Sequence, residues 1–156
     1  MTSKEEFNKL SGEIASTIGI RLLNKDLEAH LGATYPPDGD VYHRIEALCA
    51  QGEKDGWLCN REVGGIRFSR VIKPGGEAGR FSVDVVRMHD VKGPHHVHTQ
   101  GEIGMIMPID GEPRFDGMDR GWYVYEVGSD HWPTVKGGTA YVLYFLPEGA
   151  IEFTGK

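Results

Sequence analysis

The spacing of hydrophobic residues changes near Trp57. Before that point, apolar residues recur every three or four positions, which is the period of an amphipathic helix. The first such series is Phe7, Leu10, Ile14 and Ile18. Ser3 and Glu6 have the spacing of a capping box and are expected to begin this helix.

Two further helices are predicted before the change. A short one runs from Lys25 to Leu31, where Gly32 and the prolines that follow end it. Asp40 fits an N-cap for the next helix. The apolar side of this third helix is formed by Tyr42, Ile45, Leu48 and Cys49.

After Trp57 the chain consists of short β-like runs separated by turn signals such as KPGGE, PIDGEP and LPEG. The predicted strands are IRFSRVI (66–72), FSVDVV (81–86), EIGMIMPI (102–109), WYVYEV (122–127) and AYVLYFL (140–146). Many short strands with glycine turns favour a small β-barrel or jelly roll. We therefore expect a mainly β fold in one structural domain, with a helical segment at 1–54 and a barrel at 55–156.

Composition narrows the class of function. The chain has 156 residues and a net charge of −6, so a nucleic-acid surface, which needs clustered Lys and Arg, is not expected. There is no apolar run long enough to span a membrane and no signal-peptide pattern at the N-terminus, so we expect a cytoplasmic protein. Cys49 and Cys59 are predicted to be reduced and buried.

Three histidines lie within GPHHVHTQGE (93–102). Strand side chains alternate between faces, so His96 and His98 point the same way and His95 points the other way. Glu102 has the same parity and follows a turn-like TQG, which lets it return to the same place from the next strand. Two imidazoles and a carboxylate are typical ligands of a divalent transition metal.

The stretch GSDH (128–131) supplies a fourth ligand. Gly128 allows a tight turn, and His131 begins the next short run. The sequence therefore predicts one metal ion held by His96, His98, Glu102 and His131. Such ligands suit iron, manganese, zinc, nickel or cobalt, and the sequence does not choose between them.

These two motifs resemble those of the cupin superfamily: HVHTQGE matches HxHxxxE, and GSDH matches GxxH. The resemblance implies a small β-barrel with the ion inside it. A closer resemblance, over roughly Trp57 to Thr154, is to the 4-hydroxylaminobenzoate lyase family of bacterial nitroaromatic degradation. The segments that carry it are GGIRFSRVIKP, GPHHVHTQGEIGMIMPIDGEPRFDG, GWYVYEVGSDHWPTVKGG and YFLPEGAIEF.

The family resemblance implies conversion of 4-hydroxylaminobenzoate to 3,4-dihydroxybenzoate with loss of ammonia. This reaction adds water and involves no net oxidation, so no organic cofactor is expected, and the sequence has no nucleotide-binding motif. Gly104, of the same parity as Glu102, is expected to leave space beside the metal.

A substrate carboxylate needs a cation. Arg70 shares a face with Ile66 and Phe68, so it is a candidate for substrate binding and equally for a structural ion pair with Asp84 or Glu126. Arg67 and Arg87 are alternatives. Trp132, next to His131, is expected either to stack on an aromatic substrate or to pack in the core.

Proton transfer at nitrogen needs an acid, and several side chains qualify. The candidates are Tyr123, Tyr125, Tyr141, His95 and Glu126; we take Glu126 and Tyr141 forward as the predicted catalytic residues. Two other functions remain open: a cupin dioxygenase acting on a small aromatic acid, which would consume oxygen, and a non-catalytic cupin that binds a small acid. The amphipathic N-terminal segment also predicts a homodimer.

Overall fold

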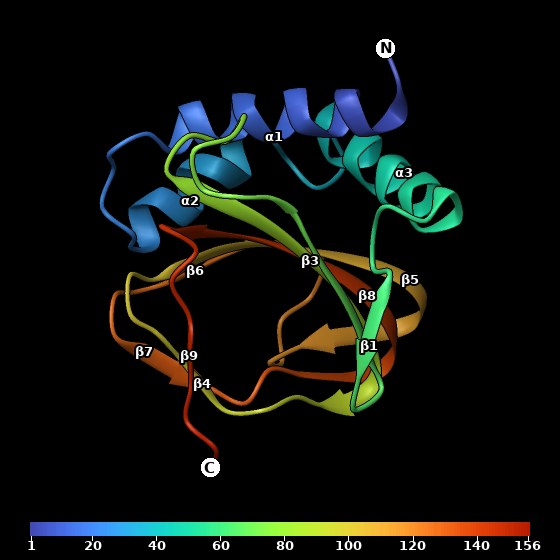
Figure 1. Cartoon of the computed structure of the whole chain (residues 1–156). Helices are drawn as coiled ribbons and strands as arrows, with labels where there is room; N and C mark the ends of the chain where they lie inside the picture. Colours follow the sequence, from blue (N-terminus) through green and yellow to red (C-terminus); the bar gives the residue numbers. More distant parts are fainter.

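The computed structural model describes residues 1–156, with three helices followed by nine strands (Figure 1). The helices are α1 (Ser3–Ile18), α2 (Lys25–Thr34) and α3 (Asp40–Asp55). The strands are β1 (Arg61–Val63), β2 (Ile66–Ile72), β3 (Phe81–Lys92), β4 (His96–His98), β5 (Glu102–Phe115), β6 (Gly121–Tyr125), β7 (Ser129–His131), β8 (Thr134–Pro147) and β9 (Glu152–Phe153). None of the helices combines the length and the apolar character needed to cross a membrane.

The strands form two antiparallel sheets. The large sheet has six strands in the order β1-β2-β3-β8-β5-β6, and the small sheet has three in the order β7-β4-β9. The helices lie together on one side of the large sheet, and the small sheet lies on the other side (Figure 1). Hydrogen bonds do not close the two sheets into one barrel, but the predicted mainly β, cupin-like jelly roll behind N-terminal helices is confirmed.

The large sheet is covered on both faces, and this decides where its side chains point. Ile103 and Met105 belong to the large apolar cluster that also contains residues of all three helices. Glu102 and Ile106, at alternating positions of β5, face the other way, toward the small sheet. A strand covered on both faces shows a continuous buried run, as Glu102–Met107 does.

Two helix starts differ from the sequence prediction by one residue. The capping box of α1 consists of Thr2 and Glu5, not Ser3 and Glu6: the Thr2 hydroxyl accepts from the Glu5 backbone N–H at 3.1 Å. Gly39 is the N-cap of α3, and Asp40 is the first helical residue. In this position the negative charge of Asp40 still stabilises the helix through its dipole. Local spacing fixes a helix start only to within a residue or two.

Other helix and strand ends differ from the prediction by more than one residue. Helix α2 continues past Gly32 to Thr34 and ends before Pro36, because the residue before a proline disfavours helical backbone. Strands β3, β5 and β8 each extend well beyond the predicted runs, since they pair with one another through bulges that sequence alternation does not reveal. Cys49 and Cys59 are buried and unpaired, as predicted.

Glu53 joins α3 to the large sheet. Its carboxylate accepts hydrogen bonds from the Tyr141 hydroxyl at 2.5 Å and from Arg87 Nη1 at 2.7 Å. Burial pushes the pKa of Glu53 upward, but the hydrogen bonds from Tyr141 and Arg87 outweigh it and hold the pKa below its ordinary value. The ionised carboxylate therefore stabilises the packing of the helix on the sheet.

Replacing Glu53 with glutamine should lower the free energy of unfolding at neutral pH by about 1–3 kcal/mol, because two hydrogen bonds to a charged group are weakened. The folded-state pKa lies below the unfolded value of about 4.3, so this stabilisation is present above that pH and is lost as pH falls through the folded pKa. Urea unfolding at neutral and acidic pH measures the difference. Glu13→Gln, at an exposed position of α1, is the matched control, and equal stability of the two variants at neutral pH would contradict the prediction.

Candidate metal centre

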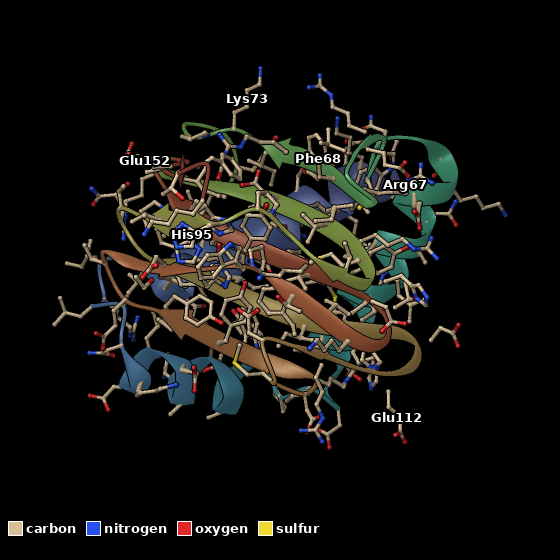
Figure 2. All side chains as sticks on the ribbon, turned by 90° about the horizontal axis from the view of Figure 1, so that it is seen from below. Arg67, Phe68, Lys73, His95, Glu112 and Glu152 are labelled. Atoms are coloured by element: carbon tan, nitrogen blue, oxygen red, sulfur yellow. The ribbon has the colours of Figure 1, made fainter.

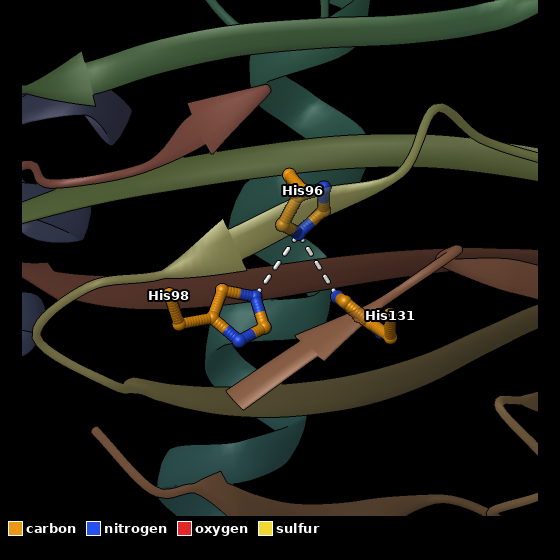
Figure 3. Close-up of side chains that lie close together, drawn as sticks. All are labelled: His96, His98 and His131. Carbon is orange, nitrogen blue, oxygen red and sulfur yellow. Dashed lines mark hydrogen bonds between the residues drawn. The ribbon is translucent and has the colours of Figure 1, made fainter. Parts of the chain in front are cut away.

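Three imidazole rings converge between the two sheets (Figure 3). His96 and His98 come from β4, and His131 comes from the neighbouring β7, where it pairs directly with His96. The Nε2 atom of His96 lies 3.0 Å from that of His98 and 2.9 Å from that of His131. The antiparallel pairing of β4 with β7 thus brings His131 next to His96 and His98, although it lies far from them in the sequence.

The outer nitrogen of each ring has a polar partner that orients it. The pairs are His96 Nδ1 with the Pro94 carbonyl at 3.2 Å, His98 Nδ1 with Ser129 Oγ at 3.1 Å, and His131 Nδ1 with Asp116 Oδ2 at 2.5 Å. The carbonyl of Pro94 and the carboxylate of Asp116 only accept, so they assign the proton to Nδ1 of His96 and His131. The Nε2 lone pairs of these rings then face the common centre.

The donor set fits a divalent cation. Nitrogen lone pairs about 3 Å apart repel one another unless a proton or a metal ion lies between them. Burial, together with the neighbouring imidazoles of His131 and His98, lowers the pKa of His96 to about 4, so this ring is neutral at physiological pH. Neutral imidazoles with fixed outer nitrogens are the usual form in which histidine binds a metal.

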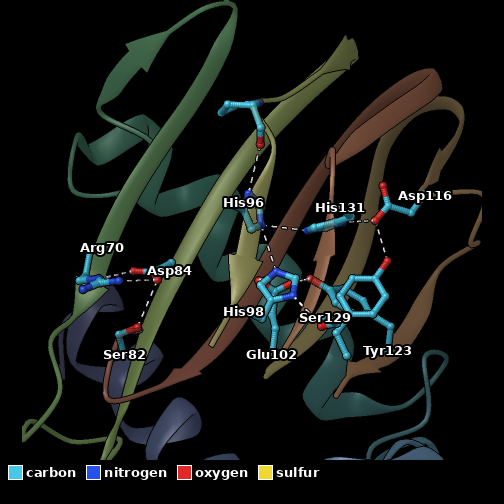
Figure 4. A network of polar contacts seen from close by, with 12 residues as sticks. Arg70, Ser82, Asp84, His96, His98, Glu102, Asp116, Tyr123, Ser129 and His131 are labelled. Carbon is cyan, nitrogen blue, oxygen red and sulfur yellow. Dashed lines mark hydrogen bonds and ion pairs between the residues drawn. The ribbon is translucent and has the colours of Figure 1, made fainter. Parts of the chain in front are cut away.

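Glu102 completes the group from the large sheet (Figure 4). Its side chain is 4% exposed, with Oε1 at 3.2 Å from His98 Nε2. Its Oε2 accepts a hydrogen bond from the Tyr123 hydroxyl at 2.6 Å. Burial would raise the pKa of Glu102, but the hydrogen bond and charge of His98 and the bond from Tyr123 keep it below its ordinary value.

The buried charge of Glu102 is a second indication of a cation. No lysine or arginine forms an ion pair with it; its only ion-pair partner is His98. An ionised carboxylate in a buried site is costly unless it is paired or coordinates a metal. The four predicted ligands are thus brought together in space, and a bound divalent ion would compensate the charge of Glu102.

Gly104 was expected to leave open space beside the metal, but the space over this glycine is filled. A β-carbon at Gly104 would collide with the ring of Tyr123, which packs directly against the glycine. Gly104 therefore admits the phenol that donates its hydroxyl to Glu102. Tyr123 was one of several candidate proton donors in the sequence, and only the sheet pairing of Gly104 with Tyr123 singles it out.

Asp116 was missed in the sequence. It lies in a turn after β5 with a φ of 50°, a left-handed conformation that non-glycine residues rarely adopt. Besides His131, its carboxylate accepts hydrogen bonds from the Tyr125 hydroxyl at 2.6 Å and from the Thr134 backbone N–H at 2.9 Å. The only signal for it was its presence in the RFDG segment of the family resemblance.

A cavity of about 360 Å³ opens onto this centre, and 11 of its 16 lining residues are hydrophobic. His96, His131 and Glu102 form its polar part, next to the phenols of Tyr123 and Tyr144. The remaining walls are Val63, Ile66, Phe68, Val86, Met88, Pro94, Phe115, Pro133, Val142, Ile151 and Phe153. An apolar cavity with a few convergent polar groups is typical of a small-molecule site.

The predicted catalytic residues do not reach this cavity. Tyr141 is buried on the opposite face of the large sheet, where its hydroxyl bonds Glu53 of α3. Glu126 follows the end of β6 and is exposed to solvent. Neither lines the cavity. Tyr141 has the opposite strand parity to Val142 and Tyr144, which do line it, and Glu126 lies beyond the end of β6.

The predicted substrate-binding residues are also outside the cavity lining. Arg70 donates from Nε and Nη2 to the Asp84 carboxylate at 2.8 and 3.2 Å, which is the ion pair that the sequence offered as an alternative. Trp132 is 42% exposed, so it is not a core residue. Its ring contacts that of His95, with centroids 4.4 Å apart.

The fold and the centre are those of a cupin-like protein with a candidate histidine and carboxylate metal site. The family model described as "PnbB: 4-hydroxylaminobenzoate lyase" matches residues 9–153, and the chain belongs to this family. A 4-hydroxylaminobenzoate lyase from Nocardioides sp. (strain LMS-CY) is 34% identical, over 85% of this chain and 84% of the relative. One from Pseudomonas putida is 30% identical, over 98% of this chain and 97% of the relative.

Solved structures similar to this chain include two cupins. An RmlC-like cupin protein from Ralstonia eutropha has a TM-score of 0.41 and 13% identity, over 54% of this chain and 57% of that one. A cupin-like protein from Thermotoga maritima has a TM-score of 0.38 and 14% identity, over 60% of this chain and 79% of that one.

Replacing Asp116 with asparagine should weaken metal binding by about 10–100-fold, because the partner that orients His131 loses its charge. The measurement is competition for the metal against a chelator of known affinity, together with circular dichroism to show that the fold is kept. Asp119→Asn removes a charge nearby from a side chain that is 71% exposed and should leave affinity unchanged. Equal affinities for the two variants would mean that Asp116 does not support the centre.

Proposed function

We propose that this protein is a metal-dependent lyase that converts 4-hydroxylaminobenzoate and water to 3,4-dihydroxybenzoate and ammonia. The observation that carries the proposal is the convergence of three histidines, with Glu102 beside them, next to an apolar, aromatic-lined cavity whose wall includes His96, His131 and Glu102. Family membership supplies the substrate class, because the relatives are named for 4-hydroxylaminobenzoate. Substrate and water together contain the atoms of the two products, and no external oxidant or reductant is needed.

The residues that would hold the ion are His96, His98, Glu102 and His131. A divalent ion supplies Lewis acidity, which polarises an N–O bond or lowers the pKa of a water molecule. Imidazole and carboxylate donors suit iron, manganese, zinc, nickel or cobalt. We propose no organic cofactor.

The cavity itself would bind and orient the ring. Its volume of about 360 Å³ lies within the range of about 300–1,000 Å³ that is usual for small-molecule sites. Phe68, Phe115 and Phe153 offer aromatic surfaces to the substrate ring. Apolar walls also exclude bulk water, so the water used in the reaction is the one that the site itself positions.

Tyr123 is the proton donor that the geometry favours. Its hydroxyl is held by Glu102, and its side chain lines the cavity. Burial, with the neighbouring charge of Glu102, raises the pKa of Tyr123 well above its ordinary value, so the phenol keeps its proton at neutral pH. We therefore propose Tyr123 for the role that the sequence assigned to Glu126 or Tyr141.

We further propose a cytoplasmic homodimer. Cys49 and Cys59 are unpaired, which suits a reducing compartment. Ile20 and Leu22, between α1 and α2, are 97% and 78% exposed and offer an apolar surface to a second copy. Sedimentation at working concentration that finds only monomers would count against the dimer.

The function is tested by incubating purified, metal-loaded protein with 4-hydroxylaminobenzoate in the absence of oxygen. We expect release of ammonia and 3,4-dihydroxybenzoate in equal amounts, since the reaction consumes only water. Both products are quantified by chromatography and an ammonia assay. A requirement for oxygen would support a dioxygenase instead, and absence of any product from folded, loaded protein would refute the proposed reaction.

Replacing His98 with alanine should abolish both stoichiometric metal binding and turnover, because it removes one of the four proposed ligands of the ion. Metal content is measured after dialysis, and turnover by ammonia release. His30→Ala, at a half-buried position of α2 outside the histidine cluster, is the control and should keep both. Normal turnover in the His98 variant would overturn the metal mechanism.

A further inference from the structure

The cavity at the metal centre lacks a partner for an anionic substrate. No lysine or arginine is among its lining residues, and its carboxylate, Glu102, is negative. The proposed substrate is a benzoate, whose carboxylate would be costly to bury among apolar walls without a cation. That the substrate is this particular aromatic acid rests on the proposed function. The cation has to come from just outside the cavity.

A second hollow adjoins the first and has the opposite charge. It has a volume of about 670 Å³ and shares four wall residues with the metal-centre cavity: Phe68, Tyr144, Ile151 and Phe153. Its charged lining residues are Lys4, Arg61, Arg70, Lys73 and Asp84, so basic groups outnumber the single acid. Positive potential in a hollow attracts an anionic ligand toward it.

Arg70 is the least available of these cations. It donates two hydrogen bonds to Asp84, and Nη2 also donates to the Gly149 carbonyl at 3.2 Å. The Asp84 carboxylate is 7% exposed, so its charge depends on Arg70 for compensation. In Figure 4 this pair lies apart from the histidine cluster. Arg70 thus has a structural partner that a substrate would have to displace.

Arg61 has no such partner. No hydrogen bond or ion pair holds its side chain or that of Lys73, and both residues are exposed. Arg61 stands directly across from Phe68 in the pairing of β1 with β2. Opposite residues of an antiparallel pair point to the same face with their β-carbons about 5 Å apart. Arg61 therefore lies in the second hollow, beside Phe68, which lines both hollows.

Lys73 lies on the same edge of the molecule as Phe68 (Figure 2). It follows the end of β2 and lines the second hollow together with Arg61. Its ammonium is a flexible point charge, whereas the guanidinium of Arg61 can bind a carboxylate through two parallel hydrogen bonds. Lys73 therefore adds to the attraction, and Arg61 supplies the directed contact.

We propose that the second hollow is the carboxylate subsite of this enzyme, with Arg61 as the residue that binds the acid group and Lys73 in support. The aromatic ring then lies in the apolar cavity against Phe68, with its other end toward the histidines. Selectivity for aromatic acids over neutral aromatics arises from Arg61, and Arg70 contributes indirectly by compensating the charge of Asp84, which also lines this hollow.

The test is calorimetric binding of two ligands, 3,4-dihydroxybenzoate and catechol, to the metal-loaded protein. They share the diol and differ only in the carboxylate. Wild-type protein should bind the acid more tightly, and Arg61→Gln should weaken the acid by about tenfold while leaving catechol unchanged. Lys73→Gln should have a smaller effect of the same kind. Arg114→Gln, which removes an exposed charge that lines neither hollow, should alter neither ligand.

Three results would overturn the proposal. Wild-type protein that binds the acid no more tightly than catechol has no carboxylate subsite. Arg61→Gln that weakens both ligands equally, or neither, removes Arg61 from the role. Selective loss of the acid in Arg70→Gln, with Arg61→Gln normal, assigns the carboxylate to Arg70. Binding does not require turnover, so these results are separate from a failure of the ammonia assay.

Discussion

The structure depends on a large β-sheet that is buried on both faces. Alternation along each strand sends one set of side chains into the helices and the next set toward the small sheet. On β5, Ile103 and Met105 point toward the helices, while Glu102 and Gly104 point toward the small sheet. Strand β5 therefore carries part of the core on one face and Glu102 of the candidate metal centre on the other, and a shift of one residue in its register would exchange the two faces.

Electrostatics divides the second face into two regions. Around the histidines the protein places the buried carboxylate of Glu102 and the neutral ring of His96, which favours a divalent cation and disfavours an anion. Beyond the wall of Phe68 and Tyr144 the balance reverses, and Arg61 and Lys73 lie in a hollow whose one acid is already paired. An aromatic acid has matching polarity: an apolar ring with a reactive group at one end and a negative charge at the other. The proposed function and the proposed subsite both follow from this match.

The supports of the centre show why its ligands were easier to predict than their partners. His96, His98 and Glu102 lie within seven residues, so strand parity together with the TQG turn predicts that they lie close together. Asp116 lies in the turn after β5 and Tyr123 lies on β6, and both reach the site through tertiary contacts that no local pattern encodes. Gly104 illustrates the difference: its parity was read correctly, but only the structure shows that the space it leaves is taken by the Tyr123 ring.

The sequence by itself determined the helical and β halves, the mainly β cupin-like class, and a set of four candidate ligands, because these depend on local periodicity and short motifs. The tertiary structure decided which face of the sheet each strand residue occupies and which distant partners meet. It placed Tyr141, a predicted catalytic residue, against α3. For Arg70, it formed the ion pair with Asp84 that the sequence had offered as the alternative to substrate binding. Those outcomes depend on strand order, bulges and the packing of the helices on one face, which are non-local properties of the chain.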